Sequence, residues 1–133
     1  MPFQKIVPKP WGHEIIFAPE GLPYTGKIMA VNAGTRWSIH YHDAKLETLT
    51  LFSGKALLWL GDKDGKMEKV PMEEKKGYTI PVNQVHRLEA LTDCVVMEAS
   101  ESERGTTVRV EDDFERKNET EEVRKDPMRG WGG

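Results

Sequence analysis

The sequence predicts an all-β protein made of antiparallel sheet, either a sandwich or a small barrel. Short runs rich in Val, Ile, Thr, Leu and aromatic residues recur along the chain, and turn-forming residues separate them. No convincing amphipathic helix precedes residue 100. A chain of 133 residues is long enough for one domain with its own core.

The segments expected to form strands lie between residues 27 and 99. They cover residues 27–31, 35–42, 46–52, 55–60, 67–72, 78–81, 86–91 and 94–99. Between the fourth and fifth lies GDKDG, whose glycines and aspartates suit the positive φ angles of a tight hairpin. These two strands should therefore be neighbours.

The two ends of the chain differ from this pattern. The first 25 residues carry five of the eight prolines, which favours an edge strand or a wrapping arm. From residue 117 the chain is charged and poor in aliphatic residues, which is typical of a loose tail. We therefore expect an arm at 1–25, a barrel at 26–116 and a charged tail at 117–133.

Composition argues against several classes of function. The net charge is −3 and no basic stripe is present, so nucleic acid is not an expected partner. We find neither a signal peptide nor an apolar run of the ~20 residues that span a bilayer, so no membrane partner is expected. The single cysteine, Cys94, lies in the apolar run CVVMEA and fits a buried thiol in a reducing, cytoplasmic protein.

Three metal donors occur within one strand-like region. In SIHYH, strand alternation places His40 and His42 on the same face. The same alternation places Glu47, Leu49 and Leu51 on one face, and the two leucines must point into a core. A carboxylate in an apolar layer costs several kcal/mol unless a positive group receives it. A divalent cation would do so.

His86 supplies a third imidazole at the start of a later strand. Three imidazoles and one carboxylate leave one or two octahedral positions for water or substrate. This set favours Mn, Fe, Co or Ni over structural Zn, which prefers closed, thiolate-rich tetrahedra. The alternative is that these are separate polar residues satisfied by ordinary hydrogen bonds.

The pattern as a whole resembles the cupins. The first cupin motif is matched in full by Gly34, His40, His42, Glu47 and Gly54. The second is matched in part: Gly77 stands closer to Pro81 than in the family, Asn83 and Ala90 replace a glycine and an asparagine, and His86 is in place. The resemblance implies an eight-stranded jelly-roll barrel, or double-stranded β-helix, with a metal at its mouth held by His40, His42, Glu47 and His86.

Among cupins, the chain looks most like the cupin domain of type II mannose-6-phosphate isomerases. The similarity lies in KPWGHE at residues 9–14, in the stretch 38–61 and in TTVRVEDDFER at residues 106–116. The chain departs from that family at His40, where glutamine is usual, in KLETL, and at Phe114 and Glu115.

This resemblance implies a sugar or sugar-phosphate isomerase with one divalent metal. Glu98 and Glu14 are candidates for the base that moves the proton. Candidate substrate-binding residues are Lys9, Trp11, Lys45, Arg87, Arg109 and Arg116. Trp37, by strand alternation, is expected opposite the histidines.

Two other functions stay open at this point. An Fe-dependent cupin dioxygenase could use the same ligand set, because its free positions can bind O2 as well as a diol. A non-catalytic sugar- or metabolite-binding cupin would keep the barrel without turnover. Small cupins commonly pair, so a homodimer is expected by resemblance.

Overall fold

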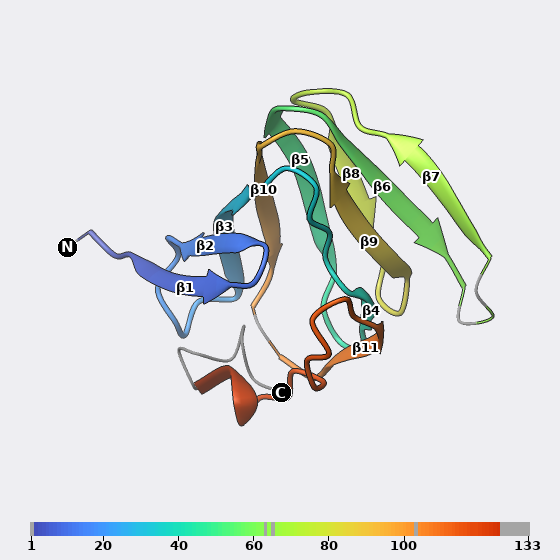
Figure 1. The fold of residues 1–133 in the computed structure, drawn as a ribbon. Coiled ribbons are helices and arrows are strands. Elements are labelled where there is room, and N and C mark those ends of the chain that lie inside the picture. The colour runs from blue at the N-terminus through green and yellow to red at the C-terminus, as the bar shows by residue number, and fades with distance from the viewer. Residues whose placement is uncertain (1, 63, 65, 103, 126–133) are drawn as a thin grey trace.

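Two antiparallel sheets face each other in the computed structural model, which describes residues 2–62, 64, 66–102 and 104–125 (Figure 1). The six-stranded sheet has the order β1-β2-β3-β10-β5-β8, and the five-stranded sheet has the order β11-β4-β9-β6-β7. The strands are β1 (Lys5–Lys9), β2 (Gly12–Ile16), β3 (Tyr24–Val31), β4 (Ile39–His42), β5 (Glu47–Ser53), β6 (Ala56–Gly61), β7 (Met67–Pro71), β8 (Gly77–Ile80), β9 (Val85–Ala90), β10 (Cys94–Glu101) and β11 (Thr107–Glu111).

This architecture confirms the predicted all-β, jelly-roll class. Within the described residues the helical content is a single 3-10 turn, η1 (Val123–Lys125). No helix in this part of the chain is long and apolar enough to cross a membrane.

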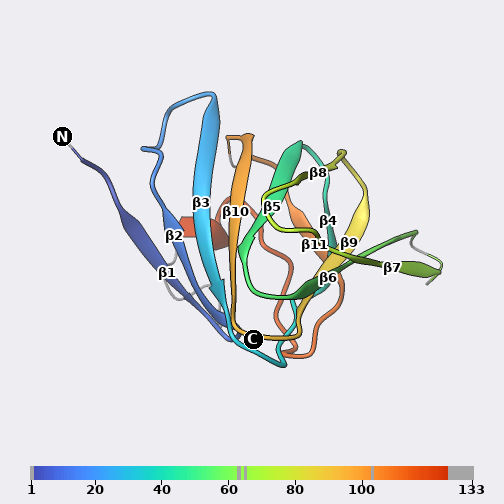
Figure 2. The ribbon, with the colours of Figure 1, turned by 90° about the horizontal axis from the view of Figure 1, so that it is seen from above.

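Each of the eight expected strands has a counterpart, β3 to β10 in chain order. The hairpin predicted around GDKDG is present, because β6 pairs with β7 in the register Leu58↔Val70. Three further strands lie outside these eight segments, and the first two of them, β1 and β2, fall in the stretch where we expected an edge strand or a wrapping arm. β1 forms an edge of the six-stranded sheet and β2 lies between it and β3, while β11 forms an edge of the other sheet (Figure 2).

The core lies between the two sheets, where alternate residues of each strand point inward. On β9, His86 and Leu88 are inside and fully buried. On β5, Glu47, Leu49 and Leu51 share the inner face, as alternation predicts. The apolar members of this core are mainly aliphatic, and those with no exposed surface include Leu49, Leu51, Leu58, Leu88 and Val96.

The segment after β11, residues 112–125, folds back along the barrel, and we call it the C-terminal strap. Its Glu119 pairs with Thr107 of β11 through two backbone hydrogen bonds of 2.8 and 2.9 Å. Its Asp113 accepts hydrogen bonds from Arg36 at 2.6 and 2.9 Å. Residues 117–125 therefore lie against the barrel, although we expected a loose tail there; residues 126–133 of that tail lie outside the described residues.

Candidate metal centre

Three imidazoles meet inside the barrel. His40 and His42 come from β4 and His86 from the adjacent β9, where His40 and His86 are directly paired across the ladder. One ring nitrogen from each lies within 4.8 Å of the other two. The three histidines, which lie up to 46 residues apart in sequence, thus come together in the structure. His40 and His42 share the face that strand alternation predicted.

The second nitrogen of each ring has its own partner. Nδ1 of His40 lies 2.9 Å from the Ser38 carbonyl oxygen, and Nδ1 of His86 lies 2.9 Å from that of Gln84. A carbonyl oxygen only accepts, so both Nδ1 atoms carry the proton and both Nε2 atoms present a lone pair. Nδ1 of His42 lies 3.0 Å from Oγ1 of Thr107. Such outer partners orient the histidines of metal sites.

Glu47 completes the cluster with a buried carboxylate. Its Oε1 lies 3.2 Å from Nε2 of His86 and 3.5 Å from Nε2 of His42. Burial alone would raise the pKa of Glu47, yet that pKa lies well below its usual value, chiefly because the Lys45 ammonium lies 3.3 Å from Oε2. Glu47 is therefore an anion at neutral pH.

His40 and His42 are held in their neutral form. Burial lowers the pKa of His40 well below its ordinary value, and the repulsion that a second protonated imidazole at His86 or His42 would cause adds to this. Burial and then the Lys45 charge lower the pKa of His42. Neutral nitrogens and a carboxylate oxygen that converge at these distances are all electron-pair donors, and a cation among them removes their repulsion. The residues therefore fit a divalent metal with an N3O ligand set.

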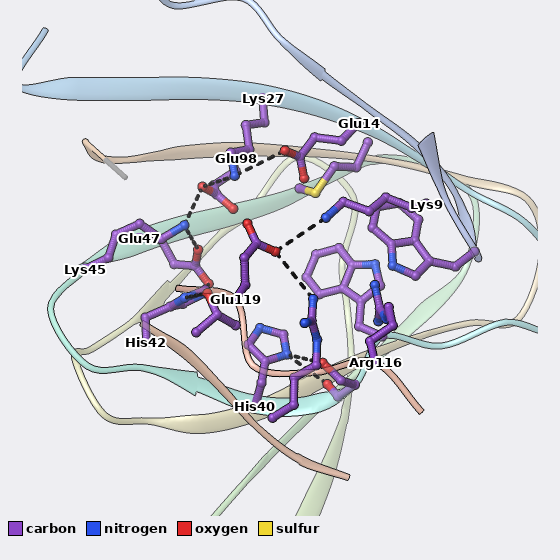
Figure 3. Close-up of a pocket in the computed structure, with 16 residues that line it drawn as sticks. Lys9, Glu14, Lys27, His40, His42, Lys45, Glu47, Glu98, Arg116 and Glu119 are labelled. Carbon is purple, nitrogen blue, oxygen red and sulfur yellow. Dashed lines mark hydrogen bonds and ion pairs between the residues drawn. The ribbon is translucent and has the colours of Figure 1, made fainter. Parts of the chain in front are cut away.

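Three members of the cluster, His40, His42 and Glu47, line a pocket between the two sheets (Figure 3). The pocket has about 540 Å³ of atom-free space, which includes open solvent. Its remaining walls are unusually rich in charge: Lys9, Glu14, Lys27, Lys45, Glu98, Arg109, Arg116 and Glu119.

Both predicted base candidates lie in this pocket. Glu98 accepts hydrogen bonds from Lys45 at 3.2 Å and from Ser100 at 2.8 Å. Glu14 forms an ion pair with Lys27 at 3.3 Å. Both carboxylates belong to the six-stranded sheet, across from the histidines on β4 and β9.

Five of the six predicted substrate-binding residues line the pocket: Lys9, Trp11, Lys45, Arg109 and Arg116. Arg87 does not, which corrects our expectation. Because His86 points inward, its neighbour Arg87 points to the opposite side of the sheet. There its Nε donates to the Trp37 carbonyl at 2.7 Å and its Nη2 approaches Asp113 at 3.5 Å, so it joins the strap to the barrel.

Several pocket residues, Trp37, Lys27 and Glu119 among them, were not identified from the sequence. Trp37 lines the pocket rather than the opposite face, because β4 begins only at Ile39 and alternation does not apply before it. Lys27 could have been found, since it shares the inner face of β3 with Met29 and Val31. Glu119 had no local signal, because it reaches the pocket through the return of the strap.

Comparison with known proteins shows the fold. No family model matches the sequence, and no curated protein matches it. Solved structures do match, at low identity. A capsular polysaccharide assembling protein, CapF from Staphylococcus aureus, has a TM-score of 0.67 and 16% identity over 89% of this chain and 31% of its own. The present chain thus spans about a third of that protein.

Two further structures support the same fold. KdgF from Halomonas sp. has a TM-score of 0.61 and 17% identity over 77% of this chain and 89% of its own. Oxalate decarboxylase from Bacillus subtilis, described with Mn(II) centres, has a TM-score of 0.64 and 16% identity over 76% of this chain and 29% of its own. These matches establish a cupin fold, whereas the likeness to type II mannose-6-phosphate isomerases stays a prediction.

Proposed function

We propose that this chain is a metal-dependent cupin enzyme that isomerises a small sugar or sugar phosphate. The observation that supports it best is the convergence of three imidazoles and the Glu47 carboxylate beside a charged pocket between the two sheets. The three histidines and Glu47 would hold one divalent ion, with Mn, Fe, Co and Ni as the candidates. When bound, such an ion polarises a carbonyl and a neighbouring hydroxyl group of an open-chain sugar.

The proton transfer is assigned to a carboxylate of the six-stranded sheet. Glu98 is the first candidate base, because Lys45 and Ser100 fix its carboxylate in place within the pocket. It would take the proton from the carbon beside the carbonyl and return it to the carbonyl carbon, while the hydroxyl proton passes to the former carbonyl oxygen, and together these transfers interconvert aldose and ketose. Glu14, paired with Lys27, is the second candidate.

The walls favour a polar, oxygen-rich guest. Lysine and arginine side chains suit phosphate groups and sugar hydroxyls, and the pocket contains five of them. Trp11 and Trp37 contribute aromatic surface, with ring centroids 5.7 Å apart. A carbohydrate role also accords with the description of CapF as a capsular polysaccharide assembling protein.

The test begins with metal analysis and continues with turnover. Protein purified without added metal is analysed for its elements, reloaded with Mn, Fe, Co or Ni, and incubated anaerobically with mannose, fructose and their phosphates. Interconversion supports the isomerase. Oxygen uptake that needs Fe(II) and a substrate would instead indicate a dioxygenase, and saturable sugar binding without turnover would indicate a binding protein.

A matched set of variants assigns the base. Glu98→Gln and Glu14→Gln keep side-chain size and remove the charge, and Glu68→Gln makes the same change on the exposed side of β7. Loss of a positioned base costs roughly 10²–10⁴-fold in rate. We expect this loss in Glu98→Gln with retained metal, and none in Glu68→Gln; full activity in both Glu98→Gln and Glu14→Gln would refute the assignment.

A further inference from the structure

One pocket carboxylate comes from the C-terminal strap and faces three cations. Oε2 of Glu119 lies 3.4 Å from Nη2 of Arg109 and 3.8 Å from Nζ of Lys9. Its Oε1 lies 3.3 Å from Nε of Arg124. The side chain is only 10% exposed, and in Figure 3 its carboxylate points into the pocket towards Lys9. A protein anion therefore fills a buried cationic corner.

Two hydrogen-bond donors in the same pocket wall have no acceptor among the described residues. They are Nε1 of Trp37 and Nε of Arg109, both fully shielded from solvent. A buried donor left without a partner costs about 1–3 kcal/mol, so native proteins rarely leave one. Such donors in a ligand pocket point to an oxygen atom of the ligand as their partner.

The corner is also crowded with positive charge. Burial, followed by the charge of nearby Arg116, lowers the pKa of Arg109. Arg116 itself holds Asp112 of the strap in a two-pronged ion pair at 2.9 and 3.2 Å. Glu119 thus offsets cations that would otherwise favour binding of an external anion.

We propose that Lys9, Arg109 and Trp37 form an anion subsite for a phosphate or carboxylate group of the substrate, and that Glu119 occupies it until that group displaces it. This inference deepens the proposed function, on which it rests for the identity of the substrate. Glu119 then competes with the ligand for this subsite. A neutral molecule of the same shape does not displace it and is therefore excluded.

The two backbone hydrogen bonds with Thr107 anchor Glu119 to β11, so displacement requires only that its side chain rotates. The competition therefore acts through charge. Removing the charge of Glu119 removes both the competitor and its repulsion of an incoming anion, and anion affinity should increase.

The test uses the full chain freed of metal with a chelator, so that anions cannot bind to an ion. Inorganic phosphate and acetate are titrated separately by calorimetry into wild type, Glu119→Gln and Glu122→Gln. Glu122 is an exposed residue of the same strap, and it forms an ion pair with Lys125 at the surface. We expect at least about tenfold tighter binding in Glu119→Gln for one of the two anions and no change in Glu122→Gln.

The identity of the anion that gains affinity distinguishes a phosphate from a carboxylate substrate. A second variant, Glu119→Gln combined with Lys9→Met, should lose the gain, since it removes a cation of the subsite. If Glu119→Gln does not fold, Lys9→Met alone should weaken binding relative to wild type. Equal anion affinity in wild type and Glu119→Gln, or a gain that survives Lys9→Met, would overturn the proposal. Neither outcome affects metal binding or turnover, which test the proposed function separately.

Discussion

The two halves of the barrel interior are built by the same strands but differ completely in chemistry. On β9 the inner face carries His86 at one end and Leu88 next to it, and on β5 it carries Glu47 followed by Leu49. One half is thus an aliphatic core, while the other is a network of imidazoles, carboxylates and cations.

This difference shows that alternation decides which residues face inward, and position along the strand decides what they do there. The aliphatic half supplies the hydrophobic stabilisation of the fold. The polar half contributes little to that stabilisation, because its ionisable groups each carry a desolvation cost. Substitutions in the two halves should therefore have separable effects.

The largest effect is expected at the histidines. His86→Ala or His42→Ala removes one of three nitrogen donors and should abolish stoichiometric metal binding while the barrel stays folded. Elemental analysis after reloading measures the bound metal, and circular dichroism with thermal unfolding shows whether the barrel is folded. His13→Ala, on the exposed side of β2, is the control. A full metal complement in both site variants would show that the cluster is not the metal centre.

In the aliphatic half we expect the opposite result, a loss of stability without a loss of metal binding. Leu58 on β6 has no exposed surface, so Leu58→Ala should cost roughly 2–5 kcal/mol of unfolding free energy through lost burial and a residual cavity. Denaturant unfolding measures this cost, and Leu91→Ala, at a residue that is 51% exposed, is the control. Metal stoichiometry of folded Leu58→Ala should match wild type; its loss would mean that the two halves are not separable.

A smaller effect is expected at Thr107, which supports His42 from behind. Thr107→Val keeps the shape of the side chain but removes the hydroxyl that lies 3.0 Å from Nδ1 of His42. Loss of such a support typically reduces metal affinity about 10–100-fold. Competition with a chelator of known affinity measures this reduction, and Thr79→Val on the exposed side of β8 should leave the affinity unchanged.

The smallest effect is expected outside the barrel, where Asp113 joins the strap to Arg36. The Arg36 hydrogen bond, assisted by the charge of Arg87, lowers the pKa of Asp113 against the opposing effect of burial. Its stabilisation is therefore present above the unfolded-state pKa of about 3.9 and is lost as pH falls through the lower folded-state pKa. Asp113→Asn should cost about 0.2–1 kcal/mol at neutral pH, and the difference from wild type should vanish in acid. A difference that is constant with pH would exclude an electrostatic origin.

Local pattern was sufficient to predict much of this molecule. Alternation in SIHYH and LETLTLF placed His40, His42 and Glu47 on the inner faces, and turn residues delimited eight strands. The inclusion of His86 in the same cluster came from the motif resemblance. Its direct pairing with His40 was not predicted, because register between distant strands is a property of the whole sheet.

The remaining features depend on long-range geometry. Strand alternation did not predict the position of Trp37, because Trp37 precedes the regular strand. Glu119 reaches the pocket because the strap returns along β11 and pairs there with Thr107. Arg87 was misplaced for a different reason. Its position next to His86 in sequence puts it on the other side of a strand, which alternation alone would have shown.

The strap has a consequence for how such a protein can diversify. Arg109, Arg116 and Glu119 fall within eleven consecutive residues, while the histidines and Glu47 belong to β4, β5 and β9. Under the proposed function, substitutions in that one short stretch would alter which ligand fits, and the strands that carry the histidines and Glu47 need not change. New ligand preferences would then be reachable in few evolutionary steps.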